Sequence, residues 1–295
     1  MLKTFFSFIF IAITFSAVSQ NFEQQFKEFS SKEDTTGQTT VLKQWEAARP
    51  KDPELFIAYF NYYAGKSRRE IVSLDDEKKD KSFSLTDSTG KPAGYLGSTV
   101  EYDGATLQKG FDFIDRGIAL YPSRLDMRFG KIYMLGEMGN FPEFTNVIVQ
   151  TIEYGNSIKH AWMWEQGKPL DDAKEFFLSS VQDYVGTLYN TEDDELLPSM
   201  RRISETVLKY FPDHVESLAN VALTYLVAGD FDKALPYLLK AEKVAPKDII
   251  VLNNIAETYK RKNDKANAKV YYEKIIKYGN TEEVQEAKEK LKELR

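Results

Sequence analysis

Apolar and small residues recur at a fixed step in the C-terminal part of the chain. Five pairs of like residues are separated by 34 positions: Pro212/Pro246, Leu218/Leu252, Ala222/Ala256, Tyr225/Tyr259 and Ala234/Ala268. Within each copy the apolar positions lie three and four residues apart, a spacing that predicts helices. A period of 34 residues is typical of helix–turn–helix solenoids, in which every unit needs its neighbours to bury its apolar face.

The same pattern predicts where these helices begin and end. In the first copy, a helix over residues 215–228 is followed by a turn at Gly229 and Asp230 and by a helix over residues 231–244. The second helix must end before Pro246, because proline has no amide hydrogen to continue it. From Asn280 onward we predict a terminal helix that covers the last repeat, since Asn280 and Glu283 have the spacing of a capping box.

These repeats resemble the tetratricopeptide repeat (TPR) family, which has small residues at the eighth, twentieth and twenty-seventh positions and proline at the thirty-second. The first copy has the expected residues at all four positions: Ala222, Ala234, Ala241 and Pro246. The second copy departs at two of them, with Ile275 and Asn280. The resemblance implies an all-α, right-handed helical-repeat solenoid that binds a peptide or a partner helix in its concave groove.

The first helix of each repeat would line that groove. In the last repeat its exposed positions are Asn253, Glu257 and Lys260, which we take as candidates for partner binding. Some members of the family hold a C-terminal carboxylate through lysine and asparagine here. Ala219 and Leu223 stand at the corresponding places of the preceding repeat, so we expect that clamp to be absent.

Fainter copies of the pattern extend toward the N-terminus. Pro122 precedes Gly139 by 17 residues, as Pro212 precedes Gly229. The pattern predicts further helices over residues 53–65, 105–121, 125–138, 142–155, 171–189 and 193–210. We therefore interpret residues 20–211 as divergent repeats and residues 212–295 as two clear repeats with a terminal helix.

Residues 67–104 interrupt the helical pattern. Val72 and Leu74 alternate with polar neighbours, and so do Phe83 and Leu85, which predicts strands. We expect a β-hairpin whose turn is the charged run 75–81, with a third short strand near Tyr95. An insertion of this length is typically functional or disordered. A flap packed on the solenoid, a partner-binding arm and a disordered loop all fit the sequence.

The N-terminal residues predict a secretory signal peptide. Lys3 precedes an apolar run over residues 5–15, and the small residues 17–19 predict cleavage after Ser19. The run is shorter than the roughly 20 residues of a membrane-spanning helix. We therefore expect residues 1–19 to be removed, leaving an extracytoplasmic chain, periplasmic in a Gram-negative bacterium, with no transmembrane span.

Composition narrows the possible partners. The chain has no cysteine, so neither disulfides nor a thiol-linked lipid can hold it. It carries 39 basic and 45 acidic residues and has no basic run. This balance argues against nucleic acid and against an anionic membrane surface as partners.

No pattern of catalytic or cofactor-binding residues stands out. The chain lacks GxSxG, P-loop and GxGxxG motifs, and its only histidines, His160 and His214, have no partner at metal-ligand spacing. We expect no metal or cofactor and no enzymatic activity. His160 falls at a helix end, where an imidazolium would interact favourably with the helix dipole. Asp193 and the two acids after it suit the start of a helix.

The tryptophans leave one alternative open. Trp45 lies in an apolar helical pattern and is expected in the core, whereas Trp162 and Trp164 lie outside the repeats. Large aromatic side chains are mostly buried, but an exposed pair would form a stacking platform for a sugar. The sequence thus favours a protein-interaction scaffold of the cell envelope, with a glycan-binding surface protein as the alternative.

Overall fold

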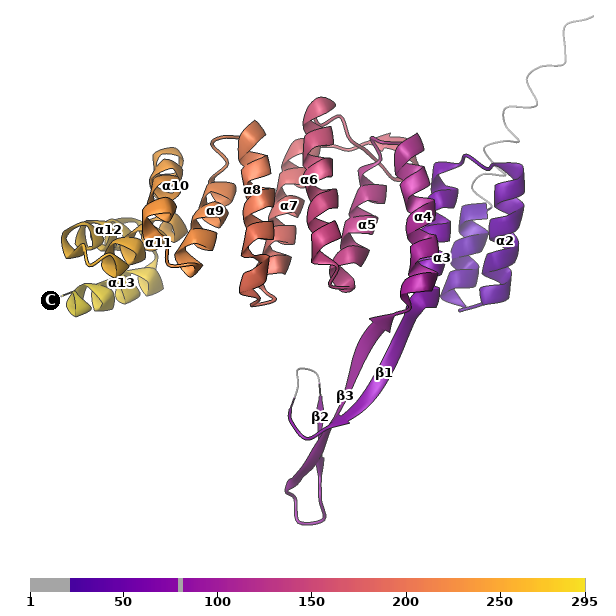
Figure 1. The fold of residues 1–295 in the computed structure, drawn as a ribbon, viewed down its shortest axis with the longest axis horizontal. Helices are drawn as coiled ribbons and strands as arrows, with labels where there is room; N and C mark the ends of the chain where they lie inside the picture. Colours follow the sequence, from indigo (N-terminus) through magenta and orange to yellow (C-terminus); the bar gives the residue numbers. More distant parts are fainter. Residues whose placement is uncertain (1–21, 79–81, 295) are drawn as a thin grey trace, which may run out of the picture. The chain divides into compact units, whose positions relative to one another are not determined.

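The computed structural model describes residues 22–78 and 82–294, so the predicted signal peptide, residues 1–19, lies outside the described residues. The chain divides into two compact units. The first holds the chain up to Met134 together with Met163–Pro169, and the second holds Leu135–Trp162 together with the chain from Leu170 onward. Helices make up most of both units (Figure 1). The first unit also contains an inserted three-stranded antiparallel sheet and a two-stranded one, β4 (Met163–Trp164) with β5 (Lys168–Pro169). The predicted fold class, a TPR-like helical repeat with a β insertion, is confirmed.

The first unit is built on antiparallel helices. After a helical segment over residues 22–31 come α2 (Thr35–Ala48), α3 (Pro53–Ser67), α4 (Gly104–Leu120) and most of α5 (Leu125–Glu137). Aspartates cap three of them: Asp34 accepts a hydrogen bond from the Gly37 amide in α2, Asp52 one from the Glu54 amide in α3, and Asp103 one from the Thr106 amide in α4. Such caps satisfy amides that have no partner within the helix.

Aromatic residues on α3 pack against glycines on α4. Tyr59 stacks on Phe113 with ring centroids 3.9 Å apart. A Cβ atom at Gly117 would lie 2.9 Å from the Cβ of Phe56, closer than two carbons can approach. The unusual aromatic content of α3 is therefore matched by missing side chains on α4, which lets the two helices pack closely. Trp45 is 1% exposed, as predicted.

The second unit continues the helical pairs. Its elements are α6 (Phe141–Ser157), α7 (Ala173–Tyr189), the 3₁₀ turn η2 (Asp194–Leu196), α8 (Leu197–Tyr210), α9 (Val215–Val227), α10 (Phe231–Val244), α11 (Ile249–Arg261), α12 (Lys265–Tyr278) and α13 (Thr281–Glu293). The predicted helices agree with these bounds to within a few residues, and the acidic run at Asp193 starts a helix as expected.

The 34-residue step is visible in the packing of α9 to α12. The N-cap residues Asp230 and Asp264 occupy equivalent positions. Stacked tyrosine pairs repeat in the same way: Tyr225 with Tyr237 at 6.2 Å, and Tyr259 with Tyr271 at 5.7 Å. Five alanines are completely buried where the helices meet: Ala222, Ala234, Ala241, Ala256 and Ala268. Small side chains there let neighbouring helix backbones approach each other.

Helix α13 ends the second unit as predicted. The Asn280 side chain accepts hydrogen bonds from the amides of Glu282 and Glu283, and the Glu283 carboxylate accepts one from the Asn280 amide at 2.7 Å. This reciprocal pair is a capping box. Ala287, 2% exposed, anchors the helix in the same core cluster as Tyr272 and Ile275 of α12.

The insertion is a three-stranded antiparallel sheet with strand order β1-β3-β2. Its strands are β1 (Arg68–Asp75), β2 (Phe83–Thr86) and β3 (Pro92–Tyr102). The predicted hairpin across the charged run is wrong, because β1 and β2 do not pair with each other. The third strand is also not short: β3 is the longest, and it pairs antiparallel with both others, so β1 and β2 run parallel to each other.

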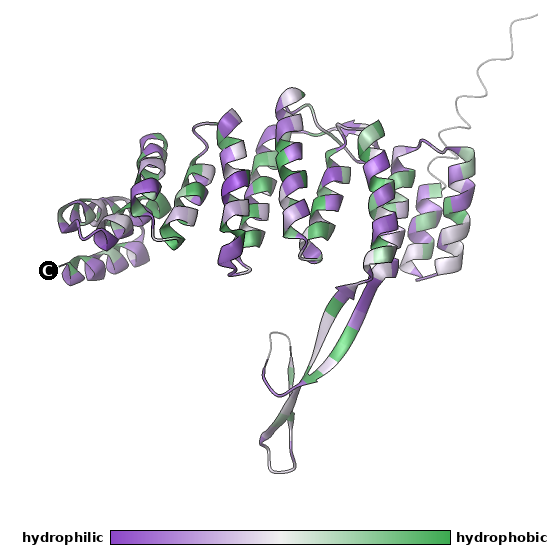
Figure 2. Cartoon of the chain, in the orientation of Figure 1, coloured by the Kyte–Doolittle hydropathy of each residue, from purple (hydrophilic) through white to green (hydrophobic). Residues whose placement is uncertain are grey.

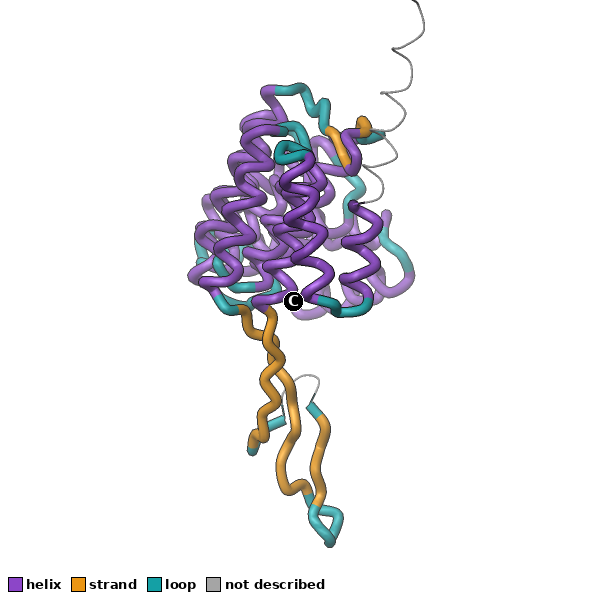
Figure 3. Tube along the Cα trace, turned by 90° about the vertical axis from the view of Figure 1, so that its right-hand side faces the viewer, coloured by secondary structure: helices purple, strands orange, loops and turns teal. Residues whose placement is uncertain are grey.

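The sheet extends away from α3 and α4 as a separate arm (Figures 1 and 3). Its two ends meet at the helices, where the Asp103 amide donates to the Ser67 carbonyl at 2.8 Å. Most side chains along β1 and β2 are exposed. The interpretation of the insertion as a flap packed on the helices is therefore wrong. The hydrogen bond between Asp103 and Ser67 joins the end of α3 to the start of α4 at the base of the sheet.

Candidate protein-binding site

The predicted groove residues of α11 lie along one side of the helix, and all three contact α13. Lys290 donates to the Asn253 side chain at 3.3 Å and forms an ion pair with Glu257 at 3.0 Å. Lys260 pairs with Glu293 at 2.7 Å. Their role in binding a partner stays a prediction, and such a partner would have to replace contacts that α13 already makes.

Glu257 is held in its charged form. Burial acts to raise the pKa of Glu257, but hydrogen bonds from Tyr272 and Lys290 outweigh burial and lower it. The Tyr272 hydroxyl donates to the carboxylate at 2.6 Å, and burial together with this bond raises the pKa of Tyr272. The network fixes α13 to α11 and α12, which gives Glu257 a structural role.

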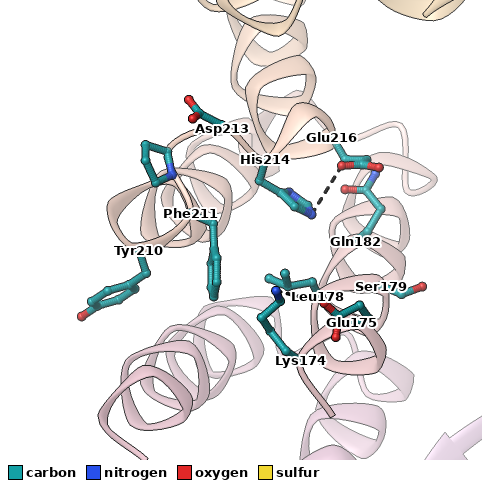
Figure 4. A pocket seen from close by; sticks show the side chains of 11 residues that line it. Lys174, Glu175, Leu178, Ser179, Gln182, Tyr210, Phe211, Asp213, His214 and Glu216 are labelled. Atoms are coloured by element: carbon teal, nitrogen blue, oxygen red, sulfur yellow. Dashed lines mark ion pairs between the residues drawn. The ribbon is translucent and has the colours of Figure 1, made fainter. Parts of the chain in front are cut away.

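A more open site lies between α7 and α9 in the second unit. A cleft of about 630 Å³ is bounded by the first turns of α7, by the α8–α9 turn and by the start of α9 (Figure 4). Leu178 and Phe211 provide its apolar surface. Gln182 lies deeper along α7 and accepts a hydrogen bond from Asn220 of α9 at 2.6 Å, which ties the two helices together.

The rim of this cleft is predominantly acidic. Lys174 is the single cation among the lining residues, and it pairs with the adjacent Glu175 at 2.9 Å. Asp213, which pairs with Lys240 at 3.4 Å, and Glu216, 3.4 Å from His214, add two further carboxylates, with side chains 70% and 58% exposed. These charges are accessible to solvent, so the cleft suits a partner segment that is basic rather than acidic.

His214 on the cleft wall is the N-cap of α9. Its Nδ1 accepts a hydrogen bond from the Ser217 amide at 3.3 Å, and the same position one repeat later is the N-cap Asp248. Burial lowers the pKa of His214 despite the nearby Glu216. A neutral imidazole keeps the lone pair that capping requires.

His160 differs from the sequence-based interpretation. It follows the C-cap of α6 in a left-handed conformation, with φ of 58°. Its ring packs against Phe177 and Phe211, and neither ring nitrogen has a hydrogen-bond partner. Burial lowers its pKa, so the expected imidazolium at a helix end is wrong: the apolar surroundings favour the neutral ring.

The two tryptophans do not form an exposed pair. Trp162 is 1% exposed and packs against Tyr154 and Phe177. Trp164 is half-buried and lies edge-on to Phe129. Trp162 is therefore wrong as a binding candidate, because the second unit buries it in its core. Half of the proposed sugar platform is thus missing, while the role of Trp164 stays a prediction.

The sequence did not single out the cleft. Its lining residues come from α7, where the 34-residue step is lost, and from the turn before α9. The one available signal was His214, which occupies the position of the capping Asp248. Within the described residues, no group of three or more acidic or histidine side chains is placed to hold a metal ion. None of the described helices has the length and hydrophobicity to cross a membrane.

Comparison with known families supports the repeats directly. The tetratricopeptide repeat profile matches residues 215–248 and 250–281, which correspond to α9–α10 and α11–α12. The profile thus covers two consecutive helical pairs in the C-terminal part of the chain. Comparison with curated protein sequences yields no match.

Several solved structures resemble the chain at low sequence identity. YrrB, a TPR protein with an unusual peptide-binding site, is 14% identical, with a TM-score of 0.42 over 84% of this chain and 97% of YrrB. PilW, a type IV pilus biogenesis factor, is 11% identical, with a TM-score of 0.39 over 91% of this chain and 97% of PilW. The C-terminal part of a TPR protein from Cytophaga hutchinsonii is 11% identical, with a TM-score of 0.41 over 87% and 78%.

Proposed function

We propose that this chain is a non-catalytic protein-interaction scaffold of the bacterial cell envelope. The open cleft between α7 and α9 carries the proposal, since it joins an apolar surface to an exposed charged rim. The neighbouring TPR units support a binding role, because TPR scaffolds present the first helix of each repeat to a partner. The envelope location rests on the predicted signal peptide alone.

The partner segment would be extended and basic. A chain lying along α7 and α9 meets Leu178 and Phe211 with apolar side chains and meets Glu175 and Glu216 with lysine or arginine. The lysine–asparagine clamp for a C-terminal carboxylate is missing at Ala219 and Leu223. These two positions lie outside the cleft, but the acidic rim of the cleft itself disfavours a terminal carboxylate, so an internal segment, and not a free C-terminus, fits best.

A photo-crosslinking amino acid at Ser179 tests the cleft. Ser179 is exposed and lines the cleft, whereas Thr187 is an exposed residue of the same helix that does not. We expect a crosslinker at Ser179 to capture one envelope protein that a crosslinker at Thr187 does not. The capture should be lost when a second substitution, Glu216→Lys, reverses the charge on the rim. Equal capture from both positions would argue against the cleft as the binding site.

The location has its own test. Expression of the full chain in a Gram-negative host, followed by cell fractionation and N-terminal sequencing, should yield a periplasmic protein beginning at Gln20. A chain that keeps Met1 and stays in the cytoplasm would rule out the envelope assignment and leave the binding proposal standing.

A further inference from the structure

The arm is amphipathic although nothing in its own unit covers its apolar side. Residues paired across an antiparallel ladder lie on the same face of a sheet. The register aligns Leu74 with Leu96 and Leu96 with Phe83, which places one row of apolar side chains across all three strands. Further apolar side chains share this face: Val72, Leu85 and Val100. Figure 2 shows these hydrophobic stretches along the strands.

The opposite face of the arm is mostly polar. It carries Arg69, Ser73 and Asp75 of β1 and Thr99 and Glu101 of β3, together with Ile71 and Tyr95. Arg68 and Glu70 lie on the apolar side, at the end of β1 that adjoins the helices. An antiparallel sheet with one apolar and one polar face normally packs its apolar face on other protein. The arm therefore has the pattern of a half-buried sheet without the element that would bury it.

Exposure is greatest at the outer strands. Val72 and Leu74 on β1 are 66% and 68% exposed, whereas Leu96 and Val100 on the central strand are 39% and 41% exposed. The outer edge of β1 pairs with no strand among the described residues. The eight-residue strand β1 thus combines open backbone hydrogen-bonding groups along its outer edge with the uncovered side chains of Val72 and Leu74.

The size of the apolar face limits what can bind there. β3 has 11 residues, so at about 3.3 Å per residue and about 10 Å for two strands the face covers roughly 350 Å². A stable interface between folded proteins buries about 800 Å² on each side. The arm is too narrow to hold a second folded domain by this face, but it matches a single extended segment.

The charges along β1 define the orientation of that segment. β1 begins with the basic Arg68 and Arg69, which Glu70 follows, and ends at Asp75, which Asp76 follows. Arg69 lies 3.5 Å from Asp103 but keeps 69% of its side chain exposed. In an antiparallel pair, the start of an added strand lies beside the end of β1. Its first residues would therefore be basic and its last residues acidic, because opposite charges across a ladder stabilise the pair.

We propose that the outer edge of β1 is a strand-addition site for an extended segment of a partner protein. The segment has apolar residues at alternate positions beside Val72 and Leu74, basic residues at its N-terminal end and acidic residues at its C-terminal end. Backbone hydrogen bonds hold it to β1, and its apolar side chains extend the apolar face. The inference rests on the proposed role as a binding scaffold, and it identifies which part of the insertion makes contact.

Two labelled peptides of identical composition test this site. One is Lys-Lys-Val-Thr-Val-Thr-Val-Glu-Glu, and the other exchanges its charged ends. With the mature full chain, fluorescence anisotropy should show at least tenfold tighter binding of the first peptide. The swap Arg69→Asp with Asp75→Arg should reverse this preference. Equal affinities, or tighter binding of the second peptide by the unchanged chain, would overturn the charge argument.

Variants of the two faces locate the contact. Val72→Glu, on the apolar face beside the open edge, should weaken binding at least tenfold, whereas Ser84→Glu, on the polar face of β2, should leave it unchanged. Replacing residues 68–102 by a short glycine linker should abolish binding while the helical circular dichroism persists, since Ser67 and Asp103 already meet. Binding that survives this replacement would rule out the arm.

Two other occupants give different results. If analytical ultracentrifugation shows a dimer, and Val72→Glu dissociates it, the occupant of the edge is a second copy of the chain and not a partner segment. If the chain binds phosphatidylcholine vesicles, and Val72→Glu abolishes that binding, the occupant is a lipid surface. The cleft variant Glu216→Lys should leave peptide binding by the arm intact, so failure of the arm and failure of the cleft can be distinguished.

Discussion

Arg124 is a buried charge that links separate segments of the first unit. Its guanidinium is 3% exposed and contacts two carboxylates at once. It donates to Glu54 at 2.8 and 3.2 Å and to Asp126 at 2.9 and 2.6 Å. Glu54 also accepts the backbone amide of Gln166 at 3.0 Å, so the cluster joins α3, the start of α5 and the β4–β5 segment (Met163–Trp164 and Lys168–Pro169).

Replacing Arg124 by leucine should destabilise the first unit strongly. Leucine fills part of the space that the arginine side chain occupies. It leaves the carboxylates of Glu54 and Asp126, whose side chains are 16% and 10% exposed, without their cation. Removing one partner of a buried ion pair typically costs about 3–5 kcal/mol, because the remaining charge is still desolvated. We expect a loss of this size in the free energy of unfolding.

Urea unfolding followed by circular dichroism, with hydrogen exchange on peptides of α3 and α5, measures the effect. Arg69→Leu is the matched control, because Arg69 is an exposed residue of the same unit, 3.5 Å from Asp103, and its loss should change little. The triple variant Glu54→Leu, Arg124→Leu, Asp126→Leu should regain much of the loss, since it removes the unpaired charges as well. If Arg124→Leu and Arg69→Leu lose the same stability, the burial argument is refuted.

Three smaller changes test other contacts by the same unfolding measurement. Tyr272→Phe removes the hydrogen bond to Glu257 and should cost about 1–2 kcal/mol, whereas the exposed Tyr278→Phe should be neutral. Asn280→Ala removes the capping box of α13 and should cost about 1 kcal/mol, with faster hydrogen exchange in its first turn. Burial lowers the pKa of His160, so its protonation favours the unfolded chain and stability should fall as the pH drops below about 6.5. Asparagine tolerates the left-handed backbone at this position, so His160→Asn should make that fall shallower without abolishing it, because the pKa of His214 is lowered too.

The helices were predictable because their signals are local and repeated. Alanine at positions 222, 234 and 241 indicates close helix packing in the sequence, and the structure buries all three completely. Asn280 with Glu283 predicts a capping box for the same reason, since both partners lie within one turn. Each of these signals depends only on residues that are near one another along the chain.

The strand order of the arm could not be read in the same way. Alternation at Val72 and Leu74 and at Phe83 and Leu85 identifies strands, but it does not specify which strands pair. The nearest strands in sequence, β1 and β2, are separated by β3, which pairs with both. Pairing depends on contacts between residues far apart in the chain, so the expected hairpin was wrong although the strand residues were right.

The candidate site shows a related limit. Asn253, Glu257 and Lys260 fall on one side of α11 by helical spacing, but only the placement of α13 reveals that Lys290 and Glu293 contact them. The cleft beside α7 has no repeated spacing to mark it, because Lys174 and Glu216 come from segments 42 positions apart in the sequence. Spacing along the chain predicts which residues share one face of a helix. Which other helix covers that face is known only from the folded structure.

The residues that stabilise the helical pairs differ from the residues that form the two proposed binding surfaces. Buried alanines and tyrosines hold the helical pairs of the second unit, and none of the fully buried alanines lines the cleft. The arm leaves the first unit through a closed neck at Ser67 and Asp103, so its exposed apolar face is not needed to hold the helices together. An uncovered apolar sheet carries a risk of aggregation and brings no stability to the fold it leaves. Its presence on this chain is best accounted for by a segment that binds there.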